Sequence, residues 1–70
     1  MLFNIGDLIL WKTTEEISYI TGTWLDYNKE VYYTIEIYNT QHQKFFTECI
    51  GEERIKVLLE YGSIAHYPVR

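Results

Sequence analysis

The chain has 70 residues and a formal net charge of −4, which suits one domain over residues 1–70. Its six Lys and Arg residues form no basic run that could match a phosphate backbone or an anionic lipid surface, so we expect neither nucleic acid nor a membrane as partner. Cys49 is the only cysteine, which excludes an internal disulfide and a Cys-rich zinc site.

A domain of this size is marginally stable unless dense packing or self-association helps it. The composition favours dense packing, because 47% of the residues are apolar and 17% are aromatic. The first ten residues carry no positive charge ahead of an apolar run, so we expect no signal peptide. The expected location is cytoplasmic, in a host cytoplasm or inside a virion, with a reduced thiol.

Two strands are predicted in the first part of the chain. Leu8 to Trp11 is a short apolar run that suits a buried strand. Ile17 to Asp26 reads as a second strand, in which Ile20 and Trp24 share one face. Gly22 inside this strand indicates a bulge or the sharp bend that a barrel corner needs.

The clearest strand of the sequence runs from residue 31 to residue 38. Nearly every residue in it is β-branched or aromatic, and two sets of side chains alternate along it. We assign one set to the core face: Val31, Tyr33, Ile35 and Ile37.

A turn at residues 39–42 leads to a fourth strand, Lys44 to Ile50, which pairs with the third as a hairpin. We expect Phe45, Thr47 and Cys49 to point inward, with Cys49 acting as a small buried hydrophobe. Glu48 is then a solvated charge on the exposed face.

Residues 51–62 admit two interpretations, because the period of a short apolar run does not separate strand from helix. In the preferred one, a short 3₁₀ or helical turn near residues 51–54 precedes a fifth strand with Ile55, Val57 and Leu59 on one face. In the alternative, an α+β fold ends in a C-terminal helix over residues 52–61 with Gly62 as its C-cap. Residues 61–70 form an ordered tail or a last edge strand.

The opening Phe3-x-Ile5-Gly6-Asp7-Leu8-Ile9-x-Trp11 resembles the start of SH3-like barrels of the Tudor and KOW kind, where Gly-Asp leads into the first strand. The resemblance covers residues 3–59 and implies an all-β, five-stranded SH3-like barrel. It also implies a binding or adaptor role, although this superfold hosts many functions. The overall character of the chain also resembles small orphan proteins of tailed phages.

Catalytic chemistry is not expected. Cys49 and His42 would lie about 20 Å apart along one strand, too far for a thiol–imidazole hydrogen bond. His66 could approach Cys49 only through the tail. No metal-ligand spacing and no Gly-rich phosphate loop occur in the sequence, so no catalytic residue, metal or cofactor is assigned.

The aromatic residues are the one feature that points to a function. Tyr and Trp are enriched at interface hot spots, because they combine a large apolar area with a polar tip. We therefore predict a non-enzymatic protein-binding or adaptor module, acting on a host or phage protein. The alternative is a structural subunit of a larger assembly, such as a phage particle or a homo-oligomer, for which the apolar tail argues. The predicted binding residues are Trp11, Tyr32, Tyr38, Tyr61 and Tyr67.

Overall fold

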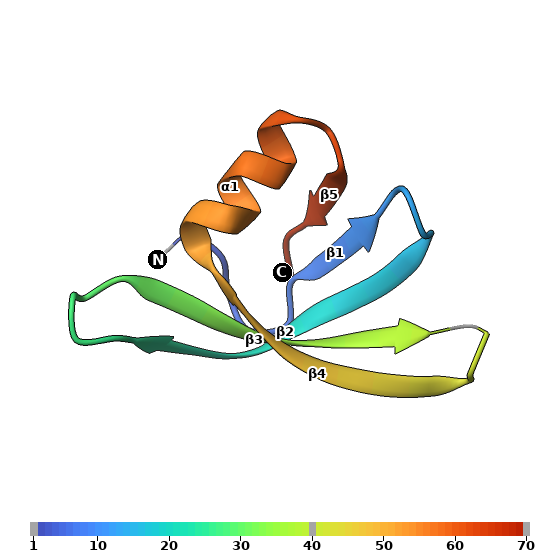
Figure 1. Cartoon of the computed structure of the whole chain (residues 1–70), viewed down its shortest axis with the longest axis horizontal. Coiled ribbons are helices and arrows are strands. Elements are labelled where there is room, and N and C mark those ends of the chain that lie inside the picture. Colours follow the sequence, from blue (N-terminus) through green and yellow to red (C-terminus); the bar gives the residue numbers. More distant parts are fainter. Residues whose placement is uncertain (1, 40, 70) are drawn as a thin grey trace.

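The computed structural model describes residues 2–39 and 41–69. Its elements are β1 (Leu8–Trp11), β2 (Glu16–Leu25), β3 (Val31–Asn39), β4 (Lys44–Gly51), α1 (Glu52–Glu60) and β5 (Ile64–Tyr67). The strands form one antiparallel sheet in the order β4-β3-β2-β1-β5 (Figure 1). The expected all-β class is thus confirmed as a single open sheet with one short helix. The predicted domain bounds and the predicted turn at 39–42 include Met1, Thr40 and Arg70, which lie outside the described residues.

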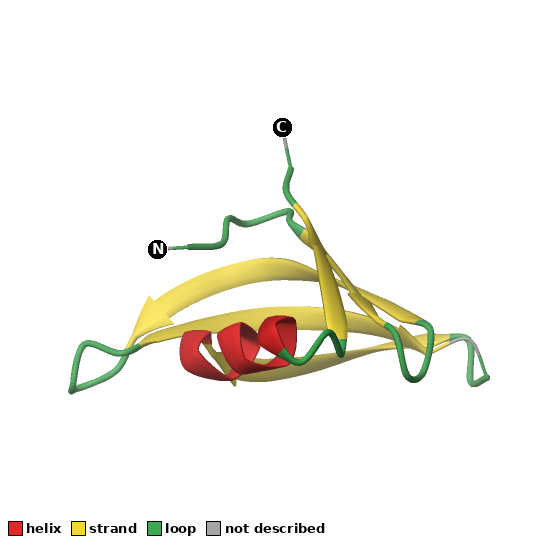
Figure 2. Cartoon of the chain, turned by 90° about the horizontal axis from the view of Figure 1, so that it is seen from above, coloured by secondary structure: helices red, strands yellow, loops and turns green. Residues whose placement is uncertain are grey.

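The two faces of the sheet differ in what covers them. One face, which we call the inner face, packs against α1 and the N-terminal segment and carries the core (Figure 2). The opposite face, which we call the outer face, has no described element packed on it. The core consists of Phe3, Ile9, Ile20, Tyr33, Ile35, Ile55 and Ile64. No helix in the described part of the chain is long and apolar enough to cross a membrane.

The bulge expected at Gly22 is confirmed, and it changes which residues share a face of β2. Ile20 pairs with Ile35, but the next pair joins Gly22 to Thr34, so Thr21 is the extra residue. An extra residue reverses the alternation beyond it. Ile20 is therefore buried on the inner face, whereas Trp24 lies on the outer face, and the prediction that they share a face was wrong.

The faces of β3 are as predicted, but those of β4 are reversed. Tyr33 and Ile35 are fully buried. They lie opposite Ile50 and Glu48, and directly opposed residues share a face. Phe45, Thr47 and Cys49 therefore lie on the outer face, and Cys49 is exposed rather than buried. Two adjacent phenylalanines make the alternation of β4 ambiguous, so the hairpin register decides its faces.

The predicted strand at residues 55–59 is wrong, and the helical alternative holds for Glu52–Glu60. Ile55 is fully buried, and Leu58 and Leu59 pack beside it, so one apolar stripe at spacings of three and four residues faces the core. Val57, which a strand would place beside Ile55, is exposed. The fifth strand instead comes from residues 64–67, which pair with β1.

Gly62 ends the helix in a left-handed conformation with φ of 74°. The Gly62 N–H donates to Leu59 and the Ser63 N–H to Leu58, which satisfies carbonyls at the end of the helix. A Cβ atom at Gly62 would meet no atom within 4 Å, so a substitution there acts through the backbone alone. Gly62→Ala should cost about 1 kcal/mol. A thermal melt should show this as a fall in Tm of about 4–8 °C, and an unchanged Tm would contradict the assignment.

Candidate functional site

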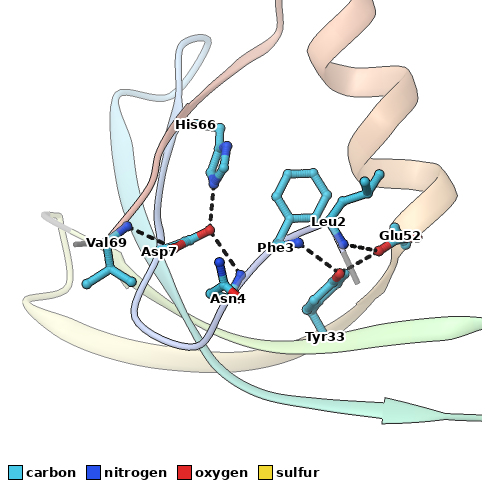
Figure 3. Close-up of polar contacts among 8 residues, drawn as sticks. All are labelled: Leu2, Phe3, Asn4, Asp7, Tyr33, Glu52, His66 and Val69. Atoms are coloured by element: carbon cyan, nitrogen blue, oxygen red, sulfur yellow. Dashed lines mark hydrogen bonds and ion pairs between the residues drawn. The ribbon is translucent and has the colours of Figure 1, made fainter.

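Two polar clusters hold both ends of the chain on the inner face, and the first is centred on the buried Asp7 (Figure 3). This fully buried carboxylate accepts hydrogen bonds from the N–H groups of Val69 at 2.9 Å and Asn4 at 3.0 Å, and it lies 2.6 Å from Nε2 of His66. Burial raises the pKa of Asp7, but the hydrogen bonds from Val69, Asn4 and His66 outweigh it and hold this pKa below its usual value. Each of the three donors comes from a segment near one end of the chain, and the Asp7 carboxylate joins these segments. Its role is therefore structural.

The second cluster joins β3, the helix and the N-terminal segment. The Tyr33 hydroxyl donates to Glu52 at 2.5 Å and accepts from the Phe3 N–H at 3.2 Å, while the Leu2 N–H donates to the same carboxylate (Figure 3). Burial, together with the hydrogen bond to Glu52, raises the pKa of Tyr33 to about 12. The hydroxyl therefore stays protonated near neutral pH and serves as a fixed donor to the start of the helix.

The structure separates the thiol from the imidazole rings that the sequence offered as partners. Cys49 lies on β4 and His66 on β5, and these are the two opposite edges of the sheet. His42 lies in the turn that precedes β4, whereas Cys49 is close to the end of that strand. Among residues 2–39 and 41–69, no three His, Cys, Asp or Glu side chains lie close enough together to hold a metal ion.

The outer face carries the most distinctive surface of the molecule. The strand register places apolar side chains in two rows that run across the sheet. In the first row, Leu10 lies opposite Ile17, Ile17 opposite Tyr38, and Tyr38 opposite Phe45. In the second row, Tyr67 lies opposite Leu8, and Leu8 opposite Tyr19. We call these seven residues the outer patch. Its four most exposed members keep 44–56% of their surface accessible: Leu8, Ile17, Phe45 and Tyr67.

The aromatic rings of the outer patch touch one another. The Phe45 ring lies 5.1 Å from that of Tyr38 and 6.4 Å from that of Tyr19, measured between ring centroids. Tyr19 also donates a hydrogen bond to Glu36, which raises the pKa of its hydroxyl and places one carboxylate beside the rings. Rings held by their neighbours lose little freedom when a partner covers them.

A second aromatic pair lies at the other end of the same face. Trp24 and Tyr32 stack with centroids 4.7 Å apart and rings inclined by 14°. Asp26, burial and Glu30 together raise the pKa of Tyr32. A shallow cleft of about 330 Å³ lies beside this pair, lined by Lys29, Glu30, Val31, Tyr32, Gly51, Glu52 and Glu53.

The five predicted binding residues do not form one surface. Tyr38 and Tyr67 belong to the outer patch, and Tyr32 lies on the same face in the second pair. Trp11 is on the inner face instead, where its indole N–H donates to Ser18 at 2.8 Å. Tyr61 is highly exposed at the end of the helix and lies on no strand of the sheet.

Sequence reasoning missed most of the outer patch, although one signal for Leu8 and Leu10 and another for the neighbouring Trp24 were present. Trp11 lies two residues after the buried Ile9, so the alternation of side chains along a strand places both on the inner face. The same alternation places Leu8 and Leu10 on the outer face. The bulge at Gly22, carried through to the alternation, would have moved Trp24 outward. Phe45 had no comparable signal. Comparison of the chain with protein-family models, with curated proteins and with solved structures found no match.

Proposed function

We propose that this protein is a small, non-enzymatic protein-binding module and that the outer patch is the surface on which its partner docks. The observation that carries the proposal is the exposure of Leu8, Ile17, Phe45 and Tyr67 within one set of apolar side chains on the uncovered face. Contiguous exposed apolar patches mark interaction sites, whereas scattered apolar residues do not. A patch rich in Tyr and Phe supplies the anchors on which interface energy concentrates.

The charges near the outer patch indicate the chemistry of the partner. Glu36 stands among the rings, and the whole chain carries a net charge of −4. A complementary partner therefore has an apolar centre and a basic or donor-rich rim. Such charge complementarity accelerates association and selects among partners more than it adds affinity.

We also propose that the fold is related to SH3-like barrels, which is consistent with a binding or adaptor role. The order of the strands supports this relation, since β1 to β4 follow one another across the sheet and a helical segment then leads to a last strand beside β1. An exposed, unbridged Cys49 is compatible with a reducing compartment, such as a host cytoplasm or the interior of a virion.

The proposal is tested by capture of partners from the native source, quantified by mass spectrometry. A variant with Ile17→Lys and Phe45→Lys places two charges in the outer patch and should lower recovery of the partner at least about 30-fold, as the loss of a hot spot does. Tyr27→Lys with Tyr61→Lys is the matched control, because both tyrosines are more exposed and lie outside the patch. Circular dichroism verifies that both variants fold. Equal recovery by wild type and by the patch variant refutes the proposal.

A further inference from the structure

The strand β4 forms one open edge of the sheet. It has eight residues and pairs with β3 on one side, while no described strand pairs with its other side. The opposite edge, β5, has only four residues and is followed by Pro68. A long edge strand presents a row of backbone N–H and C=O groups that can accept another strand, and proteins commonly guard such edges with charges. β4 is therefore the edge at which strand addition would form the longer ladder.

Two opposite charges stand on the inner face of this edge. Lys44 and Glu48 lie opposite Asn39 and Ile35 of β3, and both side chains share a face with Phe46 between them. The Lys44 Nζ lies 5.9 Å from the centroid of the Phe46 ring, and Phe46 keeps 43% of its surface exposed. Along the inner face of β4, the ammonium group of Lys44, the exposed ring of Phe46 and the carboxylate of Glu48 therefore follow one another.

We propose that two copies of this chain pair antiparallel through β4, about a two-fold axis at Phe46, and so join their sheets into one. In this register Lys44 lies directly opposite Glu48 of the partner subunit, and the symmetry makes the contact twice. The two Phe46 rings meet on the axis. The contacts that set this register, made by Lys44, Phe46 and Glu48, lie on the inner face, whereas the outer patch lies on the opposite face and shares only Phe45 of β4 with the edge. The proposal does not depend on the function proposed above.

The charges favour this register over those shifted toward the C-terminal end of β4. Paired strands must keep their faces matched, so the axis can move only by whole residues along β4. An axis at Thr47 places Glu48 opposite the apolar ring of Phe46 of the partner subunit. An axis at Glu48 places two carboxylates directly opposite each other, which is destabilising. With the axis at Phe46, both charges on the inner face of β4, Lys44 and Glu48, lie opposite a charge of the other sign.

The same pattern favours a second copy over an unrelated strand. An unrelated strand would need a cation and an anion at the same spacing and in the reverse order, whereas a copy of β4 provides both by symmetry. The net charge of −4 per chain opposes association only weakly, because exposed charges farther apart than about 8 Å are screened at physiological ionic strength. The two Phe45 side chains would become diagonal neighbours on the outer face, which would make the two outer patches continuous.

Sedimentation of charge variants tests the proposal and its register together. Lys44→Glu alone places two carboxylates opposite each other in the dimer, and Glu48→Lys alone places two ammonium groups opposite each other. Each variant should weaken self-association about tenfold or more. An equimolar mixture of the two variants restores opposite charges at both contacts, so the mixture should form a heterodimer about as stable as the wild-type dimer.

Lys12→Glu and Glu60→Lys are the matched controls, since both positions are exposed and lie outside β4, and they should leave self-association unchanged. A wild-type chain that sediments as a monomer up to millimolar concentration overturns the proposal. It is also overturned when the single variants dimerise as well as wild type, or when their mixture stays monomeric. Capture by the outer patch uses a different variant pair, so failure of one proposal is distinguishable from failure of the other.

Discussion

Asp7→Asn is expected to lower the free energy of unfolding by about 3 kcal/mol. Asp7 is fully buried and serves donors from Val69, Asn4 and His66. The substituted amide keeps the shape but has one acceptor oxygen, and its NH₂ group would face an N–H donor. A chain of this length has roughly 4–10 kcal/mol of stability, so the loss is a large fraction of the total. Urea denaturation at neutral pH measures it.

The same substitution should flatten the dependence of stability on acid. The pKa of Asp7 is lower in the folded chain than its usual value of 3.8. A carboxylate of this kind contributes stability that is present above the unfolded pKa and is lost as the pH falls through the folded one. Between neutrality and about pH 2 the wild type should therefore lose more stability than Asp7→Asn.

Glu60→Gln is the control for the loss of one negative charge, because Glu60 is exposed at the end of the helix, and it should change stability by less than about 0.5 kcal/mol. Parallel acid profiles for the wild type and Asp7→Asn would contradict the role assigned to the carboxylate.

The contrast between the two faces of the sheet gives the second large effect. Ile35→Ala should cost about 3–4 kcal/mol, because Ile35 is fully buried in the core and its removal leaves a cavity. Phe45→Ala removes a larger side chain but should cost less than about 1 kcal/mol, since Phe45 is 56% exposed on the outer face. Urea denaturation of both variants measures the difference.

The order of these two losses is the informative result. If Phe45→Ala destabilised the chain more than Ile35→Ala did, then the outer face would be part of the core and the face assignment of β4 would be wrong. With the expected order, Phe45 contributes little to folding, which leaves its ring available for a contact outside the chain.

Local pattern determined most of the sheet. The strands near Leu8, Ile17, Val31 and Lys44 were predictable, because β-branched and aromatic runs bounded by turn residues specify extended backbone through short-range sterics. The core face of β3 followed from its alternation, and the bulge followed from Gly22. These features depend on neighbours a few residues away, so the sequence contains the information for them.

Tertiary structure decided what local pattern left ambiguous. The local pattern of residues 55–59 suits a strand as well as a helix, and these residues form the helix while Ile64–Tyr67 takes the edge beside β1, where Asp7 binds His66 and Val69. The faces of β4 depend on the hairpin register, since a shift of one residue reverses every side chain. The outer patch therefore appears only when five strands are aligned, because its rows join residues that are far apart in the chain.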